Sequence, residues 1–196
     1  GKQAYLATPE HIALVQKLAD AGVGLVNIHQ AVEFSPAFAQ QSMNWIGAAY
    51  NALSSRGHWD SVHDSFPAHA VTQGVTAWKL NDGWLNRFKF VEGMKGITPL
   101  VWSGKEKLGS PEGGDPDIVS WTFDRPAGGR SFSFSGLDAH GAWEHAGMRK
   151  LVINGILWSA NIQLPTDGAK CDADKALIDS FLTPRTAPPP KAKAAK

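Results

Sequence analysis

The stretch GVGLVNIHQAVE, residues Gly22–Glu33, contains the pattern that decides the fold. After two glycines, the apolar run Leu25–Ile28 leads directly into His29 and Gln30. A short, nearly continuous apolar run that follows a helix predicts a strand buried on both faces, as in a parallel sheet. Ligands of open α/β sheets bind outside the carboxyl ends of such strands. His29, Gln30 and Glu33 are therefore candidate site residues, although His29 could simply cap the strand.

The segments around this strand predict an α/β chain. Thr8 and Pro9 are typical of the N-cap and first position of a helix, and Ser35 and Pro36 open a second helical segment. The later pattern predicts first a β-hairpin and then a long closing helix, over Ile118–Phe123, Ser131–Ser135 and Met148–Ser159. The residues Asn81-Asp82-Gly83 predict a corner between two short strands.

A buried parallel strand needs neighbours on both sides, yet only one helix precedes Gly24. We therefore expect residues 1–165 to be an α/β domain that lacks its N-terminal strands. Residues 166–183 would form a C-terminal extension. Residues 184–196 contain almost only Pro, Ala and Lys, which predicts a disordered tail.

Charge and composition exclude several classes of partner. Without the four basic residues of 185–196, 15 Lys and Arg face 18 Asp and Glu, so the folded part is mildly acidic and unsuited to nucleic acid. No apolar run approaches the ~20 residues of a membrane span. Any export signal would lie upstream of Gly1, so the sequence leaves the compartment open.

The sequence indicates neither a metal nor a cofactor. Cys171 is the single cysteine, which excludes a multi-cysteine metal site. Two pairs of histidines, His58 with His63 and His140 with His145, are five residues apart, which is not the spacing that places two ligands on one helix face. The chain also lacks a glycine-rich phosphate-binding loop of a recognised kind.

Two histidines are the candidate catalytic residues, His29 after the first strand and His140 after the last. If Asp138 or Glu33 orients their imidazoles, they could act as general acid and base near neutral pH. The alternative is that His140 caps the closing helix and Asp138 forms a turn. Amidotransfer is excluded, because His29-Gln30-Ala31 stands where a thiolate would be needed.

Eight tryptophans are more than an ordinary chain of this length carries. Three of them, Trp59, Trp84 and Trp143, lie in segments that we expect to be loops, beside His58, Asp82 and His140 respectively. An aromatic face next to carboxylate and amide groups suits a sugar, and core packing is the alternative for all three rings. We expect a sugar site formed by Gln30, Glu33, His58, Trp59, Asp82, Asp138 and Trp143 around His29 and His140.

Four segments resemble the ThuA-like (trehalose utilisation) family in their order and spacing: GVGLVNIHQAVE at 22–33, WIGAAY at 45–50, HWDSVHDSFPAHAVTQGV at 58–75, and GGRSFSFSGLDAHGAWEHAGMRKLVINGILWSA at 128–160. The resemblance implies a class I glutamine-amidotransferase-like α/β fold. This is a flavodoxin-like, three-layer αβα arrangement that normally has about two more βα units at its start. It also implies a role in disaccharide or keto-sugar breakdown.

The chain departs from the family at Gly83. Family members commonly have an Asn-Asp-Glu-Trp-Tyr run where this chain has Asn81-Asp82-Gly83-Trp84-Leu85. Two functional hypotheses follow, a sugar-modifying enzyme and a non-catalytic carbohydrate- or partner-binding domain. The paired histidines favour the first, and the missing carboxylate at position 83 favours the second. An uncovered apolar strand edge would also promote self-association.

Overall fold

The computed structural model describes residues 8–104 and 117–182. Its middle layer is a four-stranded sheet in the order β1-β8-β7-β6, with β1 and β8 parallel and the other two pairs antiparallel. The bounds of these strands are Leu25–Ile28, Arg130–Phe134, Ile118–Asp124 and Ile97–Trp102, respectively. The expected mixed α/β architecture and the β7–β8 hairpin are therefore confirmed.

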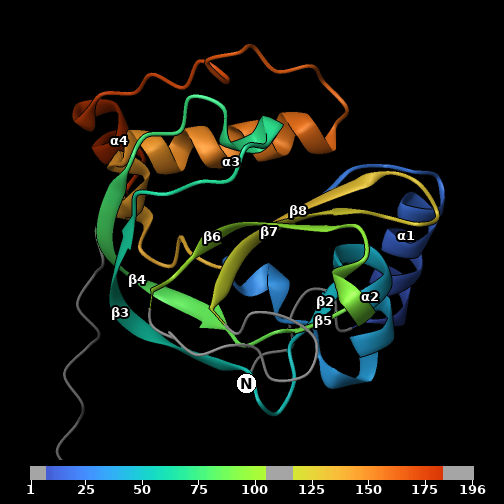
Figure 1. Ribbon diagram of the computed structural model, residues 1–196. Coiled ribbons are helices and arrows are strands. Elements are labelled where there is room, and N and C mark those ends of the chain that lie inside the picture. The colour runs from blue at the N-terminus through green and yellow to red at the C-terminus, as the bar shows by residue number, and fades with distance from the viewer. Residues whose placement is uncertain (1–7, 105–116, 183–196) are drawn as a thin grey trace, which may run out of the picture.

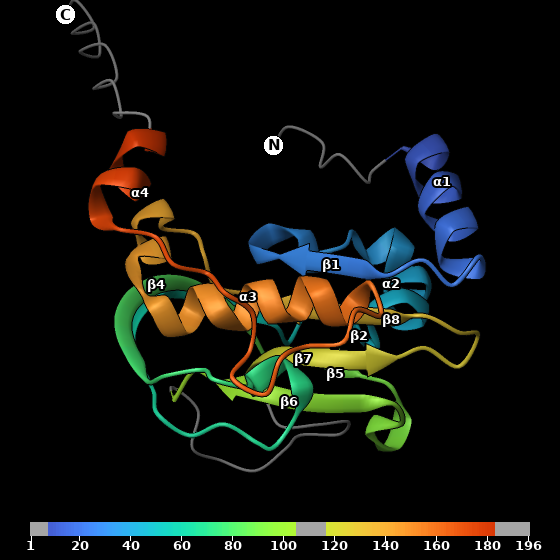
Figure 2. The same ribbon diagram turned by 90° about the horizontal axis from the view of Figure 1, so that it is seen from above.

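Helices cover both faces of this sheet. Helix α3 lies over one face, and α1 and α2 lie on the other side (Figures 1 and 2). Their bounds are Ala146–Ser159, Pro9–Asp20 and Ala39–Ile46. Thr8 caps α1 as expected, since its hydroxyl accepts a hydrogen bond from the His11 amide. The first and closing helices thus follow from their local sequence signals.

Each face of the sheet has its own apolar core. Phe132 and Phe134 of β8 are fully buried on the α3 side, where Leu151 and Val152 of α3 join the same cluster. The opposite core includes Trp45 of α2 together with Trp121 of β7. Side chains alternate along β8, so its serines face away from the phenylalanines, and Ser120 of β7 donates to the Ser133 carbonyl between the strands.

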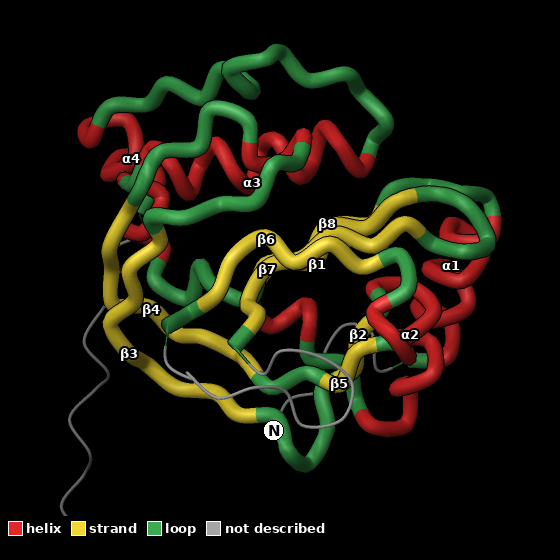
Figure 3. The backbone as a smooth tube through the Cα atoms, viewed as in Figure 1, coloured by secondary structure: helices red, strands yellow, loops and turns green. Residues whose placement is uncertain are grey.

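A long antiparallel ribbon, β3 with β4, curves beside the sheet (Figure 3). Strand β3 spans Ser55–His63 and β4 spans Trp78–Asn86. The expected corner at Asn81-Asp82-Gly83 was wrong, because these residues lie in the middle of β4 and pair with 58–60 of β3. A turn-forming sequence is overridden here by nine cross-strand pairs and by the contacts of Asp82 described below.

The remaining elements are short. A two-residue ladder joins β2 to β5, and 3₁₀ helices and one short α-helix complete the described chain. Their bounds are Ala48–Ala49 (β2), Lys89–Phe90 (β5), His29–Val32 (η2), Pro36–Phe38 (η3), Ala70–Thr72 (η4), Glu92–Met94 (η5), His140–Glu144 (η6) and Lys175–Phe181 (α4). Among the described helices, none has the length and apolar character needed to cross a membrane.

Strand β1 is less buried than its sequence suggested. Within the described residues it pairs only with β8, and Val26 is 37% exposed. The expected burial on both faces is therefore not observed, because α3 packs mainly over β8. The expected tail at 184–196 lies outside the described residues.

Candidate functional site

The site begins where two parallel strands end side by side. In the β1–β8 pair, Ile28 lies opposite Phe134, so the segments that follow both strands leave the sheet at the same edge. His29 and Ser135 are the first residues of these segments, and Nδ1 of His29 lies 3.0 Å from the Ser135 carbonyl oxygen. The sequence predicted that the first strand end and the late loop would meet, and they do.

One carboxylate lies between two imidazoles at this edge. Oδ1 of Asp138 lies 3.2 Å from Nε2 of His29, and Oδ2 of Asp138 lies 3.0 Å from Nε2 of His58. The side chain of His29 is 19% exposed and that of His58 is 62% exposed, so the two rings differ in their access to solvent. Asp138 can therefore orient one sheltered and one open imidazole at the same time.

Both ring nitrogens of His29 face oxygen atoms that only accept hydrogen bonds. Nδ1 faces the carbonyl of Ser135, and Nε2 faces the carboxylate of Asp138. The ring donates to both oxygens only when both nitrogens carry hydrogen. A neutral ring carries a single N–H hydrogen, so it donates to only one of these two oxygens, and the tautomer decides which one.

Backbone strain accompanies this arrangement. His29 has a φ of 52° and Leu137 a φ of 74°, which places both in the left-handed region that residues with a side chain seldom occupy. Strained residues of this kind persist where the surrounding structure holds them, and they concentrate at functional sites. Here the two residues flank Asp138 from the two strand ends.

A cavity of about 360 Å³, called here the Asp138 cavity, opens beside these groups. Gln30 and Glu33 come from η2 and the residue after it, and Arg56 comes from β3 and forms an ion pair with Glu33 at 3.0 Å. The complete lining is His29, Gln30, Glu33, Arg56, Gly57, His58, Gly83, Trp84, Leu85 and Asp138. The cavity is thus rich in groups that donate or accept hydrogen bonds.

Asp82 does not line the cavity, but it binds the loop that carries Asp138. Its side chain is completely buried, and its carboxylate accepts hydrogen bonds from the backbone amides of Gly83, Leu137 and Ala139 at 2.9, 2.7 and 3.0 Å. The sequence predicted Asp82 as a group that binds substrate. Its position instead suits it to hold the loop that carries Asp138.

His140 and Trp143 do not line this cavity. Residue 140 begins η6, which turns towards α4, and both side chains line a separate cavity of about 430 Å³ with Leu177, Ile178 and Phe181 of α4. Arg149 connects η6 with the segment before α4. Its guanidinium donates to the carbonyls of Trp143 and Glu144 and to those of Cys171 and Ala173. The single cleft that the sequence suggested is therefore divided between two places.

Trp59 also lies outside the Asp138 cavity. It belongs to strand β3 rather than to a loop, and its ring lies 6.5 Å from that of Trp84 and packs against the core under α3. Side chains alternate along β3, so His58 points to the open face and Trp59 to the other. Of the three tryptophans expected in loops, Trp84 alone lines this cavity, and it belongs to β4 rather than to a loop.

Sequence reasoning missed Arg56 and the paired role of His58. Both lie on the same face of β3, two residues apart, and the alternation of the nine-residue strand places them there. The signal was present in the sequence as the polar series Arg56, His58 and Asp60. Its meaning depended on recognising Ser55–His63 as one strand.

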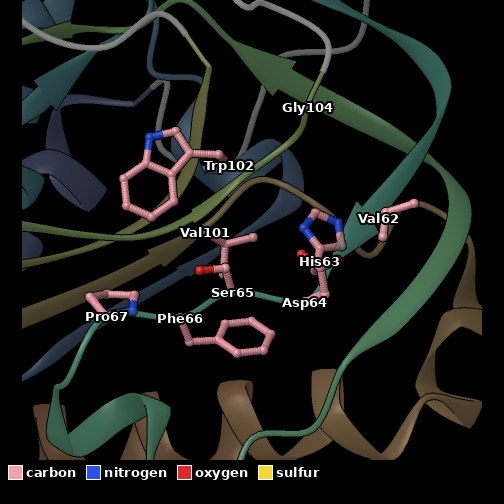
Figure 4. A pocket seen from close by; sticks show the side chains of 9 residues that line it. All are labelled: Val62, His63, Asp64, Ser65, Phe66, Pro67, Val101, Trp102 and Gly104. Atoms are coloured by element: carbon pink, nitrogen blue, oxygen red, sulfur yellow. The ribbon is translucent and has the colours of Figure 1, made fainter.

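A third cavity, of about 400 Å³, lies at the far end of β3 beside His63, Phe66 and Trp102 (Figure 4). His63 is buried, and its ring lies 4.8 Å from that of Trp78 and 5.2 Å from that of Trp84. Burial lowers the pKa of His63 to about 4, partly counteracted by the backbone of Trp102 and the charge of Asp64. The aromatic cluster thus favours a neutral imidazole. Within 8–104 and 117–182, no three His, Cys, Asp or Glu side chains are arranged to hold a metal ion.

The sequence and the fold were each compared with known proteins. The family model ThuA, described as trehalose utilisation, matches residues 2–159. The fold is similar to solved structures of ThuA-like proteins from Bacteroides uniformis ATCC 8492 (TM-score 0.55, 12% identity) and Parabacteroides merdae ATCC 43184 (TM-score 0.54, 17% identity). A search of curated proteins found no match.

These two alignments cover 78% and 85% of this chain, and the chain spans 64% and 69% of the lengths of those two proteins. The likeness to them concerns the fold, while the family model matches most of the sequence. The chain belongs to the ThuA (trehalose utilisation) family.

Proposed function

We propose that the chain binds a sugar in the Asp138 cavity and acts on it by proton transfer through His58 and His29. The observation that carries this proposal is the sharing of one carboxylate, Asp138, by His29 and His58 at the edge where β1 and β8 end. The family description, trehalose utilisation, supports a disaccharide or a keto-sugar derived from it as the ligand class. The fold is proposed to be of the class I glutamine-amidotransferase-like kind, without that activity.

The cavity lining supports a hydroxyl-rich ligand. Carboxylates of Glu33 and Asp138 accept hydrogen bonds, the guanidinium of Arg56 donates them, and the amide of Gln30 does both. A volume of about 360 Å³ lies near the lower end of the ~300–1,000 Å³ that small-molecule sites occupy. It therefore suits one sugar unit inside the cavity, with any second unit extending outwards.

The chemistry follows from the different exposure of the two rings. Asp138 holds Nε2 of His58 and leaves Nδ1 directed away from the carboxylate, where it can exchange a proton with a bound hydroxyl or with a carbon next to a carbonyl. His29 is more sheltered, and because its ring nitrogens face Ser135 and Asp138, it can exchange a proton with the Asp138 carboxylate rather than with the sugar itself. In the described part of the chain no cysteine lines this cavity, so a thioester route has no nucleophile there.

The second candidate function is binding without catalysis. It is favoured by the 62% exposure of His58 and the 40% exposure of Asp138, because an open site does not keep water away from reacting groups. Loss of the family's acidic residue at position 83 agrees with the same function. The two candidates differ in whether a bound sugar is chemically changed.

The test is calorimetric titration with trehalose and with a keto-sugar derived from it, followed by chromatography of each sugar after incubation. Asp138→Asn keeps the shape of the side chain and removes its charge, so binding should weaken and any turnover should be lost. Asp20→Asn, on the exposed surface of α1, is the control. Binding with turnover supports the enzyme, and binding without turnover supports the second candidate. If the unaltered chain binds neither sugar, the proposal is wrong.

A further inference from the structure

Gly83 lies in the middle of β4, directly opposite His58 in the antiparallel register. Its φ is not among the positive values of the chain, so the backbone conformation does not require glycine here. Glycine in a strand interior lowers stability, because it adds backbone entropy to the unfolded chain and offers no side chain to pack. The presence of glycine at this position must therefore be explained by its neighbours in the fold.

The explanation is the close approach of Asp138. A Cβ atom built on Gly83 would lie 2.7 Å from both Cβ and Oδ2 of Asp138 and 2.9 Å from its Cγ. Non-bonded carbon atoms do not approach so closely, and Cβ of Asp138 cannot turn away because it is fixed to the backbone. Any side chain at position 83 would thus push Asp138 off the strand.

Asp82 holds the same loop from the neighbouring position. Its carboxylate accepts hydrogen bonds from the amides of Leu137 and Ala139, which are the residues immediately before and after Asp138. A third bond, from the amide of Gly83, fixes the carboxylate itself on β4. The residues before and after Asp138 are therefore both bound to Asp82. Asp138 itself lies next to Gly83, where the absence of a side chain leaves room for it.

This arrangement places a carboxyl side chain in the interior and a residue of the same loop in an uncommon backbone conformation. The side chain of Asp82 is completely buried, and the amides of Gly83, Leu137 and Ala139 that donate to it all belong to the backbone. Burying a carboxylate is unfavourable unless it is well bonded. Leu137 adopts its left-handed conformation in the same loop. Such costs are commonly retained where a group must be held in one place.

We propose that Asp82 and Gly83 are positioning residues that hold the carboxylate of Asp138 between His29 and His58. The carboxylate of Asp138 then occupies the space next to position 83. It comes from the loop after β8, whereas a glutamate at position 83 would have come from β4. The use of that carboxylate in sugar chemistry rests on the proposed function. The positioning itself rests only on the geometry of these five residues.

The first experiment needs no ligand. Ring ¹⁵N and N–H proton signals of His29 and His58 are recorded at fixed pH for the unaltered chain, Asp138→Asn and Gly83→Ala. Asp138→Asn shows which signals report the carboxylate. Gly83→Ala should change those same signals in the same direction, because it removes the contact without altering Asp138. Gly141→Ala is the matched control, since a Cβ there meets nothing within 4 Å and the residue lies in the adjoining η6.

A second measurement uses the sign of the stability change. Gly→Ala at a compatible strand position normally stabilises a protein, so a lower melting temperature for Gly83→Ala would indicate the overlap. Asp138→Gly removes the three atoms that lie nearest to a Cβ on Gly83, and in that background Gly83→Ala should destabilise much less. This double-variant cycle remains informative even if Asp82→Asn fails to fold.

The results separate the two proposals. If Gly83→Ala leaves the imidazole signals unchanged and raises the melting temperature, the positioning role is overturned, whatever the sugar data show. If the signals change and the chain binds no sugar, positioning stands and the proposed function fails. If both proposals hold, Gly83→Ala should also reduce the affinity for the bound sugar by about tenfold or more, and Gly141→Ala should not.

Discussion

Nε2 of His58 lies 3.0 Å from Oδ2 of Asp138, although the two residues belong to an early strand and a late loop. This contact identifies His58 as the second histidine of the site, whereas His140, two residues after Asp138, lines the cavity under α4. We therefore expect His58→Gln to abolish turnover or to weaken sugar binding, and His140→Gln to leave both nearly unchanged. Calorimetry and product analysis on the same sugars check this.

The two variants should be equally stable. The His58–Asp138 pair is largely exposed, so its contribution to the unfolding free energy is at most about 1 kcal/mol. Urea unfolding of both variants is the control for an indirect effect. The opposite pattern, with loss of function in His140→Gln alone, would restore the pairing of His29 with His140 that the sequence suggested.

The sequence predicted those parts of the fold that depend on local signals. Thr8-Pro9 marked the start of α1, and the turn residues between β7 and β8 marked their hairpin. His29 was found because a short apolar run predicted a strand that ends there. The site was only half predicted, because its other half depends on a contact between distant segments.

That contact explains the main errors. Asn81-Asp82-Gly83 has the composition of a turn, but Asp82 turns inward to bind the backbone of the loop after β8. Gly83 serves close packing rather than chain reversal. Neither function can be inferred from residues 81–83 alone. The position of His58 could not be assigned until β4 was known to continue past these residues.

Arg125 provides a test of how the β7–β8 turn is attached to β1. Its buried guanidinium donates to the carbonyls of Gly128 and Arg130, to the hydroxyl of Ser131, and to the carbonyl of Val23 at 2.5 Å. Burial lowers its pKa below the ordinary value, but the hydrogen bonds hold the charge. Removing the group would leave the buried Ser131 hydroxyl and three backbone carbonyls in partly buried surroundings without this donor.

We expect Arg125→Met to lower the free energy of unfolding by about 2–4 kcal/mol, in line with the loss of hydrogen bonds to a charged group. Arg125→Lys should recover only part of this, since an ammonium cannot reproduce the planar fork. Urea unfolding provides the values. Arg56→Met is the comparison, because this exposed ion-paired arginine should cost less than about 1 kcal/mol. Equal effects at both positions would contradict the interpretation.

The exposed side of β1 provides a third prediction. Val26 is 37% exposed on a strand that pairs with only one neighbour among the described residues. Unpaired strand edges with apolar side chains favour association between chains, and a lysine there opposes it. We expect concentration-dependent self-association in sedimentation velocity, reduced by Val26→Lys. Leu53→Lys, which alters an exposed apolar residue outside the strands, should not reduce it.

The last prediction concerns acid stability and His63. Its pKa of about 4 in the folded chain lies below the 6.5 of an unperturbed histidine, so between these values the unfolded chain binds the additional proton. His63 therefore leaves stability unchanged above pH 6.5 and lowers it progressively as the pH falls from 6.5 towards 4. The whole difference corresponds to roughly 3 kcal/mol of unfolding free energy.

His63→Phe keeps an aromatic ring between Trp78 and Trp84 and removes the titrating group. Within the described residues no well-aligned hydrogen bond holds either ring nitrogen of His63, although the nearby Trp102 backbone favours the charged ring. The variant should therefore be at least as stable as the unaltered chain at pH 7. Urea unfolding at pH 7 and pH 4.5 should show a smaller loss for His63→Phe. Some acid sensitivity will remain, because burial also lowers the pKa of His69. Equal losses in both proteins would show that His63 is protonated without cost in the folded chain.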